Sequence, residues 1–388
     1  MVNLSRRFLV CAAASLGFAG TGRADDVSTK NPPPQKRLAC LGAALPLSGT
    51  YALQGDEVWR GIQLAVDAVN AAGGVAGGPI KLALGTMPTQ ASAAAAVNEL
   101  ISDKSVNILF GSGDSALSYA ASAAAELAQV PFIELTAPAD GIMNRGFKYL
   151  LRTGPDTSMI GQLAAETIKN RYAGRRLGLL FNAGATEGAI AAATISALGT
   201  AKQPVTLAIA YPEDVADLLA QTGRMMRAGV EVLLHAAGPD DTLGLFQAMQ
   251  SLNWRPAALI GCGAGYKLRD TQIALGSALN GTLVIAAPFY PDQAVPIAKD
   301  YEAKYGIKPR SADSCTAYVG VKLVLDTLKA VKGDPSALLG ALRQLNLPRG
   351  ALANGFGVAF NPAGQNTASF VTLQSWQTDG LTPVQDKG

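Results

Sequence analysis

The residues that could do chemistry are few in this 388-residue chain, and they lie far apart. The chain has one histidine, His235, and four cysteines, none of them in a CxxC spacing. One histidine excludes a His-rich metal site, and the cysteine spacing excludes a zinc ribbon. No GxSxG motif, credible GxGxxG motif or Walker motif supplies a nucleophile or a phosphate cradle. We therefore expect a protein that is not an enzyme, with no catalytic residue, no cofactor and no metal.

Polar and small residues collect instead in the segments that follow predicted strands. These segments are residues 46–54, 112–115, 136–140, 182–187, 236–241 and 263–266. In open parallel sheets, ligands bind at the carboxyl ends of strands, beside helix N-termini whose N–H groups attract anions. Ser, Asp, Thr and Gly are also ordinary helix-capping residues, so the pattern locates a binding site without identifying its ligand.

The elements that must position these segments alternate between strand and helix. Apolar runs predict strands near residues 37–45, 79–84, 106–110, 131–135, 176–181, 205–210, 230–235, 257–261 and 281–287. Apolar residues with a period of 3.6 predict helices between them, for example at 55–72 and 115–129. This alternation predicts an α/β fold of doubly wound parallel sheets. The series restarts after residues 148–152, so we expect two lobes, in agreement with a length of roughly two domains.

The last hundred residues depart from this alternation. Three further helices are expected at 293–305, 311–331 and 335–342, with no strong strand between them. We expect them to cover an existing sheet rather than to form a third domain. Residues 357–360 and 369–376 alternate polar and apolar positions around an NPAG turn, which predicts a terminal hairpin.

The first 24 residues have the features of a secretory signal peptide. Arg6 and Arg7 precede an uncharged apolar run at 8–19, and residues 22–24 (GRA) offer small side chains for cleavage. We prefer the general secretion route to the twin-arginine route and expect the mature protein in the periplasm. Residues 25–36 are polar and proline-rich, which predicts a flexible lead-in.

Removal of the signal peptide changes the charge and the cysteine count. The whole chain has a net charge of +3, and the signal peptide contains three arginines and no acid. The mature protein is therefore formally neutral, and its charge gives no sign of a nucleic-acid partner. Cys40, Cys262 and Cys315 remain, which allows at most one disulfide and leaves its pairing open.

Several longer stretches are characteristic of one family. They are PLSG at 46–49, VNAAGGV at 69–75, AKDYEAKYG at 298–306 and FNPAGQ at 360–365. With them, the chain resembles the type I periplasmic solute-binding proteins, in the leucine/isoleucine/valine-binding-like branch of ABC transporter receptors. The resemblance implies two α/β lobes joined by three hinge crossovers near 151–155, 288–291 and 354–360. It implies an N-terminal lobe of 37–152 plus 290–354 and a C-terminal lobe of 153–289 plus 355–388.

The resemblance also implies a function. It indicates a periplasmic receptor of an ABC importer of the branched-chain amino acid type. Such a receptor captures a small polar solute (an amino acid, an amide or a small carboxylate) by hinge closure. We expect a monomer that docks on a membrane ABC permease complex and does not bind nucleic acid. Two alternatives stay open, a periplasmic sensor of the same fold that presents its ligand to a membrane receptor and a secreted enzyme.

Nine residues are candidate ligand contacts. By resemblance, Ser115, Thr136 and Ala137 align with ligand contacts of the first lobe. Thr186 and Gly263 align with positions or segments of the second lobe that contact the ligand in the family. Tyr51 and Gln54 lie in the first loop, which in the family often reaches over the ligand. His235 and Tyr266 are candidates because each lies at or just after a strand end of the second lobe.

The chain departs from the family pattern of ligand-contacting residues at three places. Pro138 stands where a threonine is usual, Thr186 where an aromatic residue is usual, and the segment 261–265 lacks the acid that holds a ligand ammonium. A buried ammonium without a partner is unfavourable. We therefore expect a ligand without a free α-amino group. Glu134, Glu187, Asp240 and Asp241 are the acids that could replace the missing one.

Overall fold

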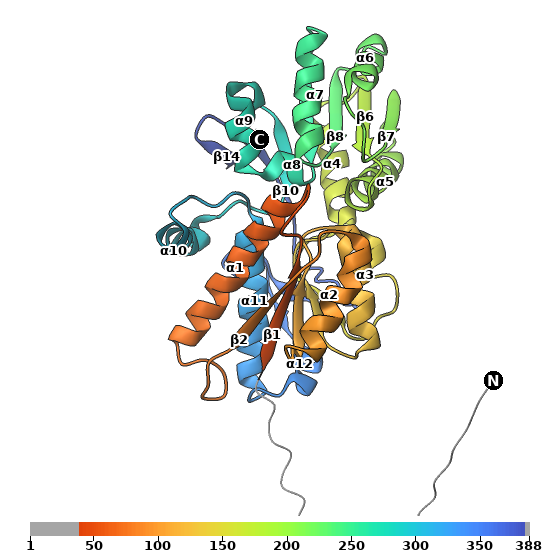
Figure 1. Cartoon of the computed structure of the whole chain (residues 1–388). Helices are drawn as coiled ribbons and strands as arrows, with labels where there is room; N and C mark the ends of the chain where they lie inside the picture. Colours follow the sequence, from red (N-terminus) through yellow and green to blue (C-terminus); the bar gives the residue numbers. More distant parts are fainter. Residues whose placement is uncertain (1–38, 385–388) are drawn as a thin grey trace, which may run out of the picture. The chain divides into compact units, whose positions relative to one another are not determined.

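The structure is a computed structural model that describes residues 39–384 (Figure 1). The predicted signal peptide (1–24) and lead-in (25–36) lie outside these described residues. Within residues 39–384, no helix is long and apolar enough to cross a membrane. Cys40, Cys262 and Cys315 are all free, so none of the pairings that the sequence leaves open is formed.

The first lobe is built on a five-stranded parallel sheet in the order β2-β1-β3-β4-β5. Its strands are β1 (Cys40–Leu45), β2 (Lys81–Thr86), β3 (Ile108–Gly111), β4 (Phe132–Glu134) and β5 (Leu150–Arg152). Helices α1 (Ala52–Ala71), α2 (Gln90–Ser102) and α3 (Ser115–Leu127) follow the first three strands. Leu41 and Ala44 are both fully buried, in separate apolar clusters. Strand β1 is therefore apolar along its length, because helices cover both faces of the first sheet.

The second lobe is built on a seven-stranded sheet in the order β14-β13-β10-β9-β8-β6-β7. Its five parallel strands are β6 (Leu177–Asn182), β7 (Leu207–Tyr211), β8 (Val232–Ala236), β9 (Ala258–Cys262) and β10 (Leu283–Ala286). The helices of this part of the chain are α4 (Thr157–Arg171), α5 (Ala185–Thr200), α6 (Leu219–Arg227), α7 (Pro239–Ser251), α8 (Ala264–Lys267) and α9 (Arg269–Leu275). The doubly wound parallel architecture predicted from the sequence is therefore confirmed, while the lobe boundaries stay predictions.

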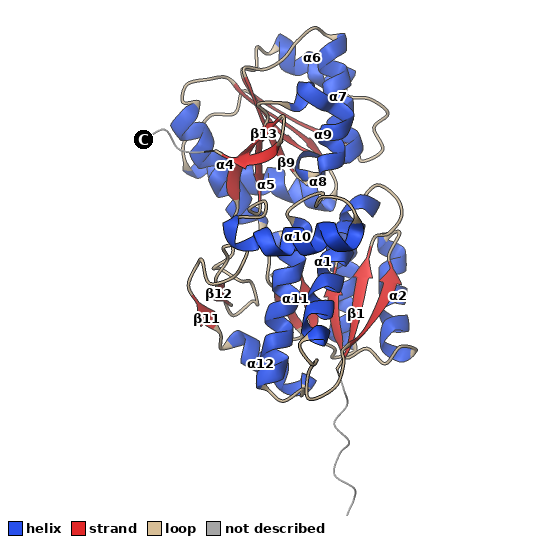
Figure 2. Cartoon of the chain, turned by 90° about the vertical axis from the view of Figure 1, so that its left-hand side faces the viewer, coloured by secondary structure: helices blue, strands red, loops and turns tan. Residues whose placement is uncertain are grey.

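The three late helices are confirmed as α10 (Val295–Tyr305), α11 (Asp313–Ala330) and α12 (Pro335–Arg343). Helix α11 packs along α1, so it covers the first sheet instead of starting a third domain (Figure 2). The two helices approach closely because Gly61 has no side chain. A Cβ at this position would lie 2.2 Å from the carbonyl oxygen of Ser314.

The NPAG turn of the predicted hairpin forms, with Phe360 bridged antiparallel to Asn366, but residues 369–376 do not pair with 357–360. Strand β13 (Thr372–Gln377) pairs antiparallel with β14 (Gly380–Pro383) on one side and with β10 on the other. Strand β12 (Val358–Ala359) pairs with β11 (Asn346–Leu347) in a separate small sheet. The tail therefore adds two antiparallel strands to the second sheet, beyond its five parallel ones.

Candidate functional site

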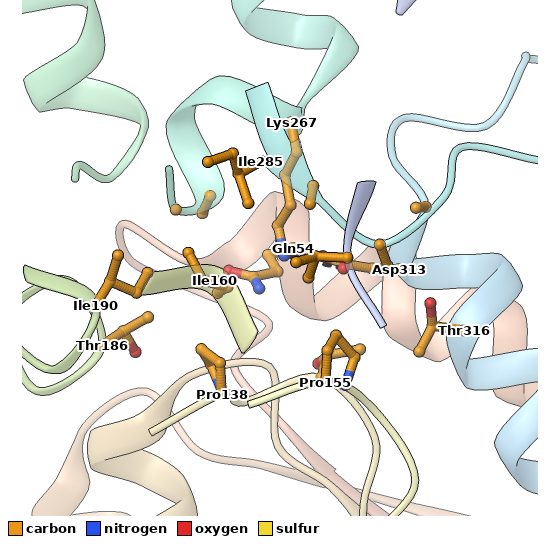
Figure 3. A pocket seen from close by; sticks show the side chains of 17 residues that line it. Gln54, Pro138, Pro155, Ile160, Thr186, Ile190, Lys267, Ile285, Asp313 and Thr316 are labelled. Carbon is orange, nitrogen blue, oxygen red and sulfur yellow. Dashed lines mark hydrogen bonds and ion pairs between the residues drawn. The ribbon is translucent and has the colours of Figure 1, made fainter. Parts of the chain in front are cut away.

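A cavity of about 60 Å³ is lined by residues of both lobes (Figure 3). From the elements of the first lobe and α11 come Gln54, Thr136, Pro138, Ala312, Asp313 and Thr316. From the second lobe and its connections come Pro155, Ile160, Thr186, Ile190, Gly263, Ala264, Lys267, Ile285, Ala286, Ala287 and Val371. Pockets for drug-sized ligands are roughly 300–1,000 Å³ and a water occupies about 30 Å³, so in this arrangement of the lobes the cavity has room for only the smallest solutes.

One end of the cavity is polar. Lys267 on α8 reaches across to Asp313, the first residue of α11, and its Nζ lies 2.9 Å from Oδ1 and 2.8 Å from Oδ2. Beside this cross-cleft pair lie Gln54 and Thr316 (Figure 3). The Oγ1 atoms of Thr316 and Thr136 are buried in the cavity lining and have no hydrogen-bond partner. Two hydroxyls are thus available to a solute as donors or acceptors.

The other end of the cavity is mostly apolar, although Thr186 lies beside Ile190 there (Figure 3). Ile160 on α4, Ile190 on α5 and Ile285 on β10 surround it, with Pro138 below them in the view of Figure 3. Branched aliphatic side chains offer no directed contact, so they suit hydrocarbon of approximately matching volume. The lining as a whole therefore offers both polar and apolar contacts to a solute.

Beside the cavity, polar contacts join the two lobes directly. The backbone N–H of Ser115 donates to Thr186 Oγ1 at 3.0 Å, and that hydroxyl donates to Asp114 Oδ2 at 2.9 Å. The Tyr51 hydroxyl donates to Glu187 Oε2 at 3.3 Å. These contacts link the two lobes in the arrangement that the structure describes.

Glu187 is the most unusual acid of this region. It is 1% exposed, and its Oε1 atom has no hydrogen-bond partner. Burial raises the pKa of Glu187 to about 7, with a further contribution from the negative charge of Asp114. The carboxyl is therefore partly protonated near neutral pH.

Four of the nine predicted contact residues line the cavity. They are Gln54, Thr136, Thr186 and Gly263. Ser115, Ala137 and Tyr51 lie beside it without lining it, and Ser115 Oγ accepts a hydrogen bond from the backbone N–H of Ala139.

The structure places His235 and Tyr266 in the core of the second lobe, away from the cavity lining. Both are fully buried, and His235 Nδ1 lies 2.6 Å from the Tyr266 hydroxyl. His235 Nε2 lies 2.9 Å from the Tyr211 hydroxyl. Burial lowers the pKa of His235 to about 3, so the ring is neutral. The side chain belongs to a packed Tyr–His–Tyr group.

The acids named from the sequence as replacements also lie outside the cavity lining. Glu134 is fully buried and accepts hydrogen bonds from Ser112, Ser118 and the backbone N–H groups of Thr136 and Ala137. Asp241 accepts from Asn182 at 2.8 Å. The acid that lines the cavity is Asp313, which the sequence analysis missed together with Lys267 and Thr316. The sequence could have indicated Asp313 only as an acid in the first turn of a predicted helix. Acids are common at that position, so this feature does not single out a binding residue.

The described residues hold no group of three or more His, Cys, Asp or Glu side chains placed to bind a metal ion. The chain thus has two α/β lobes and a cavity lined by residues of both. Residues 40–380 match the family model described as periplasmic binding protein, and the chain belongs to this family.

Relatives of known name place the chain in one branch of that family. Leu/Ile/Val-binding protein homolog 8 of Brucella abortus is 31% identical over 362 residues, which cover 89% of this chain and 89% of that protein. Homolog 7 of the same organism is 31% identical over 360 residues, covering 89% of this chain and 90% of the relative. The resemblance to the leucine/isoleucine/valine-binding branch is therefore confirmed.

Solved structures share the fold. LivJ of Streptococcus pneumoniae, a branched-chain amino acid transporter substrate-binding protein in complex with isoleucine, superposes with a TM-score of 0.80 at 20% identity, covering 89% of this chain and 98% of that one. An ABC transporter solute-binding protein of Rhodopseudomonas palustris, in complex with 4-hydroxybenzoate, gives 0.78 at 21% identity, covering 89% and 95%. The two ligands differ in chemistry, so the fold alone does not assign the solute of this chain.

Proposed function

We propose that the chain is the periplasmic substrate-binding receptor of an ABC importer of the branched-chain amino acid type. It captures a small polar solute by closing two lobes around it, and it releases the solute unchanged to a membrane permease. The branch to which it belongs supports this proposal, as does the LivJ complex with isoleucine.

The observation that carries the proposal is a cavity lined by both lobes. Gln54 and Asp313 come from one side, and Lys267 and Ile285 come from the other. A solute that contacts both sides binds the closed arrangement better than the open one, and this difference in affinity drives closure.

A binding screen of the mature protein tests the proposal. Amino acids, amides and small carboxylates are added one at a time, and the melting temperature and the radius of gyration in solution are measured. A true ligand at one hundred times its Kd stabilises the folded protein by about 2.7 kcal/mol and makes it more compact. Mass spectrometry of the recovered ligand must show it unchanged, because a converted ligand would indicate an enzyme.

A pair of matched variants on α11 links the binding to this cavity. Thr316→Val removes a buried hydroxyl that lines the cavity and has no partner. Thr327→Val makes the same change where Oγ1 donates to the carbonyl of Leu323 within the helix. We expect Thr316→Val to weaken binding of the identified ligand about fivefold. Equal binding by both variants, or no ligand in the whole screen, would contradict the proposal.

Docking on a permease requires a separate measurement. The liganded receptor should stimulate ATP hydrolysis by the reconstituted permease complex, and permease and ATPase genes next to the receptor gene would identify which complex to use. Ligand binding without any stimulation would favour a sensor.

A further inference from the structure

The cavity contains a pair of opposite charges. Lys267 and Asp313 are the only formally charged side chains among the described residues that line it. Their side chains are 15% and 5% exposed, so both charges are largely removed from water. They come from different lobes, so the pair forms across the cavity when the lobes close.

Buried charge has to be balanced. An ionised group removed from water is unfavourable unless an opposite charge lies next to it, and the cross-cleft pair meets this condition by itself. A monoanionic solute that contacts Lys267 brings a second negative charge next to Asp313. A monocationic solute brings a second positive charge next to Lys267. A zwitterion or a neutral amide leaves the total at zero.

Resting on the proposed function, we infer that the cross-cleft pair Lys267–Asp313 makes the cavity select small solutes of zero net charge. The carboxylate or carbonyl oxygen of the solute faces Lys267, and its ammonium or amide N–H faces Asp313. The Thr316 hydroxyl, which lacks a partner, lies near Asp313, and the Thr136 hydroxyl also lines the cavity without a partner. The hydrocarbon part lies toward Ile160 and the other isoleucines of the cavity.

This inference revises the expectation that the ligand has no free α-amino group. That expectation came from the absence of an acid in residues 261–265. Asp313 supplies a carboxylate to the same cavity from the opposite lobe, at the first turn of α11. A ligand ammonium therefore has a partner.

The test uses solutes that are matched in size and differ in charge. The three-carbon set is alanine, propionamide, propionate and propylamine. The larger set is leucine, 4-methylpentanamide, 4-methylpentanoate and isoamylamine. Dissociation constants are measured by calorimetry on the mature protein at pH 7. In at least one set, a neutral or zwitterionic member should bind about tenfold or more tightly than both charged members.

Two variants should shift the preference in opposite directions. Asp313→Asn leaves Lys267 unbalanced, so the carboxylates should gain about tenfold relative to the zwitterion. Lys267→Met leaves Asp313 unbalanced, so the amines should gain by a similar factor. The two variants are independent, so the shift remains measurable if one of them fails to fold.

Asp270→Asn is the matched control. Asp270 on α9 faces Arg310 across the lobes at 3.5 Å, and it does not line the cavity. This variant removes the same charge from a second cross-lobe contact and should leave the ligand preference unchanged.

Three results would overturn the inference. One is tightest binding of a carboxylate or an amine by the unmodified protein, and the second is an unchanged preference in both cavity variants. The third is binding of none of the eight solutes. Any of these results would still be compatible with the proposed receptor function if the wider screen finds a ligand. If the wider screen finds no ligand, both the receptor function and the charge selection are contradicted.

Discussion

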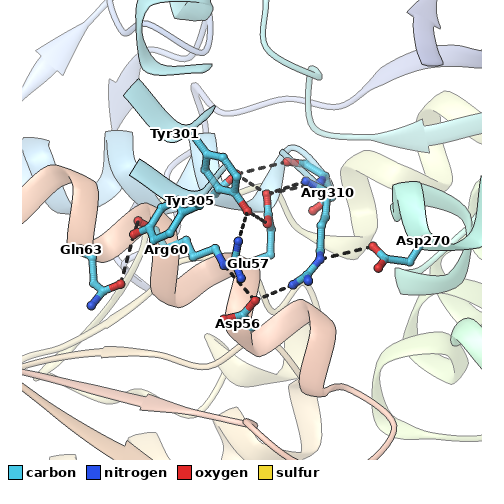
Figure 4. Close-up of polar contacts among 10 residues, drawn as sticks. Asp56, Glu57, Arg60, Gln63, Asp270, Tyr301, Tyr305 and Arg310 are labelled. Atoms are coloured by element: carbon cyan, nitrogen blue, oxygen red, sulfur yellow. Dashed lines mark hydrogen bonds and ion pairs between the residues drawn. The ribbon is translucent and has the colours of Figure 1, made fainter. Parts of the chain in front are cut away.

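Two buried glutamates, Glu57 and Glu187, differ in what surrounds them. Glu57 lies on α1 and is fully buried, and Glu187 lies in the first turn of α5 and is 1% exposed. Burial raises the pKa of each to about 7. Around Glu57, however, the donors are many. The Tyr301 hydroxyl donates to it at 2.6 Å, the backbone N–H of Arg310 donates at 3.1 Å, and the Ser314 hydroxyl also donates (Figure 4).

Around Glu187 the donors are few. Tyr51 from the other lobe reaches one carboxyl oxygen, and the second oxygen has no partner. The comparison separates two uses of a buried acid. The partners of Glu57 come from α10, α11 and the loop before α11, which pack against α1, so this network is a permanent part of the fold. Glu187 instead contacts a residue of the other lobe, so we expect its environment to change when the lobes move apart.

The largest effect is expected from Glu57→Ala. The change removes the acceptor for a buried tyrosine, a buried serine and the backbone N–H groups of residues 310 and 311. Leaving such donors unsatisfied should lower the free energy of unfolding by about 3–5 kcal/mol. Denaturant unfolding of the mature protein measures it. A loss below about 1 kcal/mol would show that the network is not structural.

Glu57→Gln keeps the shape of the side chain and serves as the control. The folded-state pKa of Glu57 lies above its unfolded value, so its protonation stabilises the fold at low pH, and this stability is lost as the pH rises from about 4.5 to about 7. The shift corresponds to about 3 kcal/mol across that window. The difference between wild type and Glu57→Gln should therefore depend on pH there, and a flat difference would contradict the assignment.

Glu187 should control closure instead. In the open arrangement its carboxyl regains water and an ordinary pKa, so the closed form binds the proton more tightly. Closure is then favoured below pH 7 and weakens as the pH rises through 7. Affinity for a solute that does not itself titrate in this range should fall about tenfold from pH 6 to pH 8. Calorimetry at several pH values measures it.

Glu187→Gln provides the comparison for that pH profile. The glutamine does not titrate, so affinity should no longer depend on pH, while Glu57→Gln should keep the wild-type profile of affinity. Loss of the profile in Glu57→Gln and its retention in Glu187→Gln would reverse the roles assigned to the two acids.

Much of the fold could be predicted because buried parallel strands are apolar runs. The predicted strand at 230–235 is β8 (Val232–Ala236), and the predicted helix at 311–331 is α11. Short helices were missed, because α8 and α9 are too short to show a period. The NPAG turn was predicted, but the pairing of the strand after it was wrong. Pairing between distant strands is not visible in local alternation, and β13 pairs with β10 about ninety residues away as well as with β14.

The site was only partly predictable for a related reason. Gln54 and Thr136, expected in segments that follow strands, line the cavity, but the strand-end rule also selected His235. Alternation along β8 places His235 on the face with Leu233, where Tyr211 and Tyr266 cover it. Lys267 and Asp313 are 46 residues apart in the chain and lie on elements of different lobes, so no local pattern pairs them.

The smallest effect is expected from Tyr51→Phe. The change removes the one hydroxyl that reaches Glu187 across the lobes, a long contact of 3.3 Å. We expect solute affinity to fall about threefold, because the hydrogen bond is weak, and the melting temperature without ligand to change little. Tyr305→Phe is the matched control, since its hydroxyl bonds the Arg60 carbonyl at 3.2 Å on α1. That variant should lose stability by about 1 kcal/mol and keep its affinity. If both variants lower stability equally and leave affinity unchanged, the contact between Tyr51 and Glu187 has no part in closure. The two glutamates would then differ only in how their side chains are packed.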